Sequence, residues 1–148
     1  MSLKWLFGLF AAFSVGPLLA GDEALEDRRL KIDMPPAAQI ALRQEMLDKL
    51  QAVQRIFSAL ADAQPAAAAD AAERQLGLSA MGKHRQLPPA ARPGQYLPEA
   101  MHALGRQSHK NGSDLAEALK RGDRAEIDGR LRDTLGTCVA CHTTYRVD

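Results

Sequence analysis

The feature that most constrains this chain is a pentapeptide near its C-terminal end. It holds the chain's two cysteines, three residues apart, with a histidine directly after the second: Cys138-Val139-Ala140-Cys141-His142. A step of three residues places two thiols about one helical turn apart. This is the pattern by which two thiols attach a haem covalently while the histidine ligates its iron. The pentapeptide predicts one covalent haem c, held by Cys138 and Cys141, with His142 as the proximal iron ligand.

Two other kinds of site also use paired cysteines. A thioredoxin-like thiol pair usually opens a helix in a βαβ unit, where the helix N-terminus lowers the thiol pKa, whereas this pair closes a helical pattern. A zinc site needs about four ligands, so the cysteines would recruit two of four histidines, none spaced as in a zinc finger: His84, His102, His109 and His142. A thiol redox site or disulfide and a zinc site therefore stay open as alternatives to the favoured haem.

The first twenty residues have the pattern of a secretory signal peptide. Lys4 precedes an apolar run that starts at Trp5, and small residues near Ala20 offer a cleavage site. The alternative is an uncleaved membrane anchor. The apolar run is near the short end of the range that can span a bilayer, roughly 17 to 25 residues. We expect an exported, periplasmic protein with no stable membrane span after signal cleavage. Outside the cytoplasm two free thiols would tend to oxidise, whereas haem attachment consumes both.

Charge and composition narrow the classes of function. The chain carries 19 basic and 18 acidic side chains, mixed throughout, for a formal net charge of +1. This balance gives no electrostatic reason to expect binding to nucleic acid or to an anionic membrane. No acid/base pair, nucleophile or nucleotide-binding loop is recognisable beside the pentapeptide, so we assign no catalytic residue and do not expect an enzyme.

Hydrophobic periodicity predicts four helices in one domain, residues 35–148, after a flexible N-terminal arm at residues 21–34. Proline is tolerated in the first turn of a helix, so the first helix starts at Pro35 and Pro36, and the second starts at Pro65 and ends near His84. The first helix carries an apolar stripe that we expect to face the core: Leu42, Met46, Leu50, Val53, Phe57 and Leu60.

A proline-rich crossover, residues 85–97, separates the second helix from the third. The third helix begins near Pro98 and is expected to kink or divide around Gly112. Gly122 and Asp123 supply its stop and the cap of a fourth helix, which carries the pentapeptide. The predicted fold is therefore all-α, an antiparallel four-helix bundle with the haem near the C-terminal helix.

A last helix with this pentapeptide, followed by Tyr145-Arg146, resembles the class II cytochromes c, the cytochrome c-prime family. Arg43 and Gln44 fit an Arg-Gln pair that opens the haem-facing stretch of the first helix in that family. The resemblance implies a cytochrome c-prime-like bundle over residues 35–148 with Arg43 in the cofactor site. It also implies Leu47 over the distal haem face, and it permits a homodimer through the first two helices.

Three further residues are candidates for the haem site. Met46 lies on the apolar stripe, and low-spin relatives in the family use a first-helix methionine as sixth ligand; its ordinary role would be to fill the core. His102, at the start of the third helix, is a less favoured distal ligand. Arg146, one turn after His142, would hold a haem propionate or polarise a bound gas, unless it is a solvated terminal arginine.

Two functions follow from these residues. Electron transfer with a redox partner protein suits an iron with a sixth ligand, Met46 or His102. The alternative is binding of nitric oxide or another small gas at a five-coordinate iron beneath the apolar Leu47, which is what the family resemblance implies. The sequence leaves the sixth ligand, and with it this choice, open.

Overall fold

The computed structural model describes residues 26–148. The predicted signal peptide, residues 1–20, and the first residues of the predicted arm lie outside the described residues. Within the described part no helix is both long enough and apolar enough to cross a bilayer.

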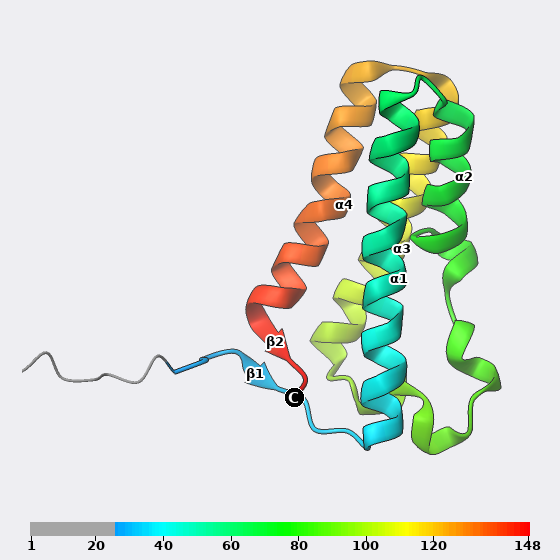
Figure 1. Ribbon diagram of the computed structural model, residues 1–148. Helices are drawn as coiled ribbons and strands as arrows, with labels where there is room; N and C mark the ends of the chain where they lie inside the picture. The colour runs from blue at the N-terminus through cyan, green and yellow to red at the C-terminus, as the bar shows by residue number, and fades with distance from the viewer. Residues whose placement is uncertain (1–25) are drawn as a thin grey trace, which may run out of the picture.

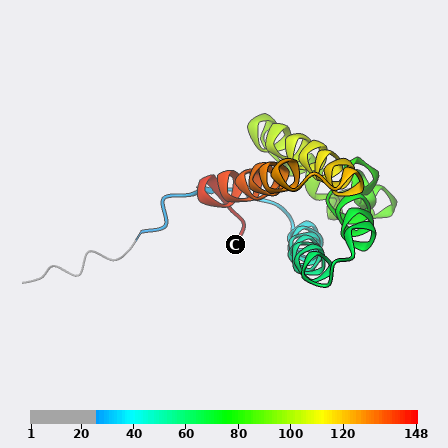
Figure 2. The same ribbon diagram turned by 90° about the horizontal axis from the view of Figure 1, so that it is seen from above.

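Four α-helices form the body of the described chain: α1 (Pro36–Ala61), α2 (Pro65–Gln75), α3 (Glu99–Arg121) and α4 (Arg124–Thr144). Each packs against the next in chain order, and successive helices run in opposite directions (Figure 1). Seen from above they form an arc, with α1 and α4 bordering its open side (Figure 2). The predicted all-α class is confirmed, and the four helices follow the predicted order.

Local chemistry fixes most helix ends where the sequence predicts them. Pro36 and Pro65 stand in the first turns of α1 and α2, where their missing N–H groups cost nothing. Gly122 ends α3 with a φ of 78°, a left-handed conformation that glycine adopts without strain. The Asp123 side chain then accepts a hydrogen bond of 3.1 Å from the Glu126 amide and caps α4.

The second and third helices differ from the expectation. α2 ends at Gln75, and the chain continues through four short 3-10 turns: η1 (Leu78–Ala80), η2 (Lys83–Gln86), η3 (Pro89–Ala91) and η4 (Pro93–Tyr96). α3 runs through Gly112 without dividing. A Cβ at Gly112 would lie 2.5 Å from the Leu76 carbonyl carbon, so this glycine serves the close approach of α2 to α3.

The predicted flexible arm is partly a docked strand. β1 (Leu30–Lys31) pairs in parallel with β2 (Tyr145–Arg146) at the end of the chain, and Ile32 and Met34 are buried. Residues 30–34 of the expected arm thus dock against the end of the bundle. Their apolar side chains have a partner surface, and their backbone completes hydrogen bonds with the C-terminal tail.

The described chain has two hydrophobic cores at opposite ends of the helices. The closed core is built mainly from alanines and long aliphatic side chains of all four helices: Ala52, Ile56, Ala68, Ala69, Ala72, Leu76, Leu115, Ala116, Ala118, Leu119 and Ile127. The open cluster joins β1, β2 and the helix ends near the cysteines: Ile32, Met34, Ala38, Leu42 and Tyr145, with Met46, Tyr96, Leu97, Met101, Leu104, Cys141 and Val147 packed against them.

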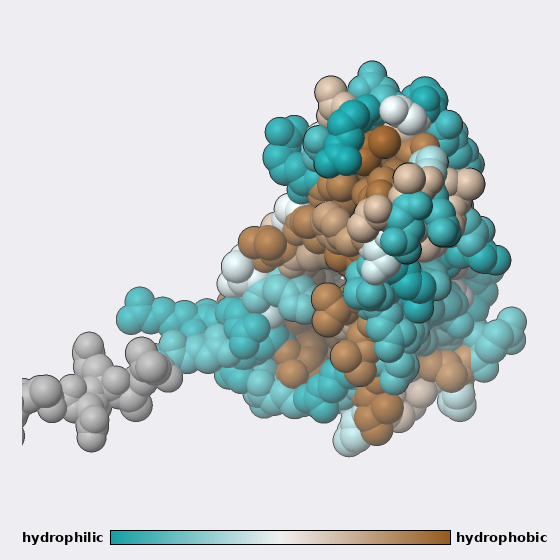
Figure 3. Space-filling view, turned by 45° about the horizontal axis from the view of Figure 1, so that its top comes forward, coloured by the Kyte–Doolittle hydropathy of each residue, from teal (hydrophilic) through white to brown (hydrophobic). Residues whose placement is uncertain are grey.

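The apolar stripe predicted for α1 is only partly core. Leu42 is buried, but Leu50 and Phe57 are 66% and 47% exposed, and Ile56 takes the deepest position instead. Apolar side chains gather on the face that holds α1 and α4 (Figure 3). A sequence pattern that is typical of burial thus lies on a surface that the protein itself does not cover.

Candidate functional site

Cys138 and Cys141 lie in the last turns of α4, and both thiols are free and half-buried. The Cys138 thiol donates to the Thr134 carbonyl oxygen at 3.5 Å. Cys141 packs against the open cluster. The two thiols therefore stand about one turn apart at the edge of an apolar region, as the spacing predicts.

The surroundings of the cysteines disfavour the alternative sites. Burial raises the pKa of the Cys138 and Cys141 thiols, and the negative C-terminal end of a helix does not favour a thiolate. A reactive thiol pair needs the opposite environment. No group of three or more His, Cys, Asp and Glu side chains suited to a metal ion occurs within residues 26–148, whereas zinc would need about four ligands.

Apolar side chains of α1 and α4, the two helices that border the open side of the arc, are left exposed in a way that fits a flat apolar cofactor. On α4, Val139 is 60% exposed and Leu135 is also exposed, and on α1 the same holds for Leu50 and Phe57. Phe57 and Leu135 line one small cavity between the helices. Two free thiols, the exposed side chain of His142 and an uncovered apolar face together fit a covalently held haem.

The two distal candidates on α1 point in different directions. Met46 is partly buried and packs against the open cluster, which also includes Cys141. Leu47 follows it and is 53% exposed, because one residue turns the side chain by about 100° around the helix. Met46 thus packs in the cluster that includes Cys141, whereas Leu47 lies on an exposed side of α1.

His102 is engaged elsewhere. Its Nε2 donates a hydrogen bond of 2.7 Å to the Gly94 carbonyl oxygen in η4, so the ring ties the start of α3 to the crossover. Met101 and Leu104, on either side of it along α3, contribute to the open cluster instead. The fold therefore gives His102 a structural contact and turns its apolar neighbours toward the cysteines.

Arg43 and Arg146 both lie against the C-terminal tail. Arg43 donates from Nη2 to the Val147 carbonyl oxygen at 3.4 Å. Arg146 pairs with Asp148, and its Nε lies 3.8 Å from Asp27 Oδ2. That buried Nε has no hydrogen-bond partner within the described residues, and a buried donor left in this state is costly. An orphaned guanidinium N–H beside the pentapeptide fits an anionic group such as a haem propionate.

A partly buried charge cluster on α1 was not predicted from the sequence. Glu45 accepts from His84 Nε2 at 2.8 Å and pairs with Lys49 Nζ at 3.0 Å. Burial raises the pKa of Glu45, but Lys49 and His84 lower it by more, so its pKa falls below the ordinary value. The Glu45–Lys49 spacing was visible in the sequence, whereas nothing signalled that His84 joins it from η2.

His109, one of the four histidines weighed for zinc, lies in the α2–α3 contact. It is buried, and its Nδ1 donates to the Leu76 and Gly77 carbonyl oxygens, both at 2.9 Å. These carbonyls follow the end of α2, where helix geometry leaves them without partners. His109 therefore completes the α2–α3 contact and takes no part in the site.

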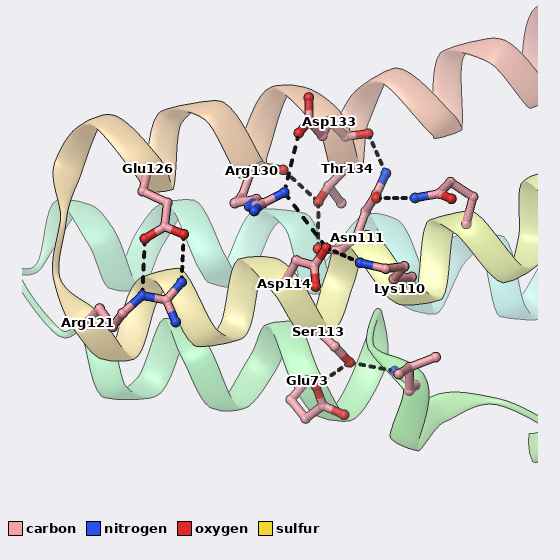
Figure 4. A network of polar contacts seen from close by, with 12 residues as sticks. Glu73, Lys110, Asn111, Ser113, Asp114, Arg121, Glu126, Arg130, Asp133 and Thr134 are labelled. Carbon is pink, nitrogen blue, oxygen red and sulfur yellow. Dashed lines mark hydrogen bonds and ion pairs between the residues drawn. The ribbon is translucent and has the colours of Figure 1, made fainter.

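A polar network holds the back of α4 against α3 (Figure 4). Asn111 Nδ2 donates to the Asp133 carbonyl oxygen at 3.0 Å, and the Thr134 hydroxyl donates to the Asn111 carbonyl oxygen at 3.4 Å. Thr134 lies one turn before Cys138, so the helix that presents the cysteines is fixed on its far side.

One comparison with known proteins bears on this site. A stretch of 50 residues is 36% identical to a cytochrome c' from Rhodospirillum rubrum. The stretch covers 34% of this chain and 34% of that protein, so the match spans about a third of the relative's length. No family model matches the chain, and no solved structure matches it. The match is a distant relationship to a cytochrome c', in agreement with the resemblance carried by the last helix.

Proposed function

We propose that this chain is a periplasmic, monohaem c-type cytochrome that transfers electrons. Cys138 and Cys141 would hold the haem by two thioether bonds, and His142 would be the proximal ligand. The haem iron, when bound, supplies the one-electron step between its ferric and ferrous states. The distant cytochrome c' relative supports a c-type haem, and the free, half-buried thiols beside an exposed apolar face support its attachment here.

The observation that supports electron transfer is that Met46 packs in the same cluster as Cys141. A thioether is a soft ligand that suits haem iron in cytochromes c and raises its potential. With Met46 on the distal side, no open position remains for a gas. The side chains of the open cluster would then keep water from the site and hold Met46 in place.

The remaining residues have supporting roles in this proposal. Arg146, with its buried and unpartnered Nε, would bind a haem propionate. Arg43 would steady the C-terminal tail through Val147. The exposed edge near His142 is the surface we expect a redox partner protein to approach, and no catalytic residue is assigned.

Optical spectroscopy of the purified protein tests this proposal. We expect low-spin spectra in the ferric and ferrous states, and Met46→Ala should convert them to high-spin spectra because it removes the sixth ligand. Leu47→Ala is the matched control and should leave the spectra unchanged. High-spin spectra of the wild-type protein would contradict electron transfer through Met46 and favour the alternative, a five-coordinate haem that binds nitric oxide or another small gas.

A further inference from the structure

The end of α4 is fastened by a segment from the other end of the described chain. We name residues 27–32 the N-terminal strap. Leu30 pairs with Tyr145, and Lys31 pairs with Arg146 in the parallel β1–β2 register. The Ile32 amide adds a hydrogen bond of 2.9 Å to the Arg146 carbonyl oxygen. The strap thus fixes Tyr145 and Arg146, three and four residues after His142.

Arg29 also contacts the backbone of His142, the proposed iron ligand. Its Nη1 donates to the His142 carbonyl oxygen at 3.3 Å. This carbonyl belongs to the last turn of α4, where helix geometry leaves carbonyl groups without partners. A cation near the C-terminal end of a helix is also favoured by the helix dipole. Arg29 therefore satisfies the backbone of His142 from outside the helix.

Asp27 holds Arg29 in the orientation that this contact needs. Its Oδ1 accepts from Arg29 Nε at 2.9 Å, and its Oδ2 accepts from Arg29 Nη2 at 2.6 Å. This two-point geometry fixes the guanidinium plane. The hydrogen bonds to Arg29 lower the pKa of Asp27 to about 2, so the pair stays charged at all ordinary pH values. Nη1 is then left free to reach His142.

We infer that the N-terminal strap orients the proximal ligand, with Arg29 as a positioning residue for His142. The inference rests on the proposed function, since it concerns His142 as an iron ligand. The direction of the imidazole follows from the backbone of the last turn, and Arg29 and the β1–β2 pairing hold that backbone from two sides. Loss of Arg29 frees the His142 carbonyl and lets the ring reorient, which changes the ligand field at the iron.

The test compares Arg29→Ala with Arg28→Ala in the full chain, produced with haem-attachment machinery. Arg28 is exposed, carries the same charge and makes none of the contacts described above, which makes it a matched control. Electron paramagnetic resonance of the ferric protein and the midpoint reduction potential are the readouts, because a merely stabilising contact would leave both unchanged. Intact mass of the wild-type protein comes first and establishes whether haem is attached.

We expect Arg29→Ala to shift both the resonance positions and the midpoint potential, and Arg28→Ala to shift neither. Arg29→Lys, which keeps a donor, should recover part of the shift, and Asp27→Asn should produce a smaller shift of the same sign. Equal spectra and potentials for Arg29→Ala and Arg28→Ala, with haem attached, would overturn the inference and leave the proposed function standing. A wild-type protein without covalent haem would overturn both.

Discussion

The two ends of the bundle bury their apolar side chains to different degrees. At the closed end Leu115 is 0% exposed and Ile56 and Leu119 are 1% exposed, because alanines let the helices approach closely. Toward the open end Leu50 and Val139 stay exposed, one turn after Met46 and next to Cys138 along their helices. The closed end completes its core from its own side chains, whereas the open end presents more apolar surface than the chain can cover.

This difference has an energetic meaning. Full burial of a leucine or phenylalanine side chain stabilises a fold by about 1.5–3 kcal/mol relative to leaving it exposed. The closed end gains this stabilisation from the protein alone. At the open end it is not gained until another apolar body covers α1 and α4, and in the proposed function the haem attached to the pentapeptide would be that body.

The largest expected effect is on the free energy of unfolding, and it compares a leucine of the closed core with an exposed leucine. Leu115→Ala should cost about 3 kcal/mol of unfolding free energy, because it leaves a cavity in a filled core. The matched change Leu50→Ala should cost under about 0.5 kcal/mol in a Cys138→Ala, Cys141→Ala background. In the chain with both cysteines, produced with haem, it should cost about 1 kcal/mol more, since the proposed haem would cover Leu50. Denaturant unfolding measures all three values, and an equal cost of Leu50→Ala in both backgrounds would contradict the comparison.

A glycine pair tests the close packing of the closed end. Gly112→Ala should destabilise the protein by about 2 kcal/mol, because its Cβ would collide with the Leu76 backbone. Gly105 lies in the same helix with nothing within 4 Å of a Cβ. Gly105→Ala should therefore stabilise the protein by about 0.5–1 kcal/mol through helix propensity. Thermal unfolding followed by circular dichroism distinguishes the two signs, and a neutral Gly112→Ala would refute the close approach.

The smallest expected effect is a pH dependence at the open end. The pKa of Glu45 lies below its ordinary value of 4.5, so its pairing with Lys49 and His84 stabilises the fold above that pH and is lost as the pH falls below it. Glu45→Gln should cost about 1 kcal/mol at pH 7, and the difference from wild type should shrink between about pH 5 and pH 3. Urea unfolding at several pH values measures this. Glu117→Gln, at an exposed pair with Lys120, is the control and should have almost no effect.

Local chemistry in the sequence predicted the helix starts at the prolines, the stop at Gly122 and the cap at Asp123, because each acts within a few residues. The pentapeptide likewise located the site on the last helix. The stripe through Leu50 and Phe57 was predicted to face the protein core, but both side chains are exposed. A hydrophobic pattern marks an apolar face of a helix, and it does not specify which part of the protein or which cofactor covers that face.

Other features depend on contacts between distant parts of the chain. β1 pairs with residues near the C-terminus, and His109 bonds to carbonyls that follow α2, so neither leaves a local pattern. Whether Met46 or Leu47 faces the site depends on how α1 is rotated about its own axis, because consecutive side chains point about 100° apart. Tertiary packing sets this rotation, so the sequence left both residues as candidates.

The central claim is that the open end is completed by a covalent haem on Cys138 and Cys141. Intact mass spectrometry of the full chain, produced with haem-attachment machinery, tests it most directly. The account predicts a mass increase of one haem that survives denaturation and disappears in the Cys138→Ala, Cys141→Ala variant. A purified wild-type protein whose two thiols are free or joined in a disulfide, with no added mass, would contradict it.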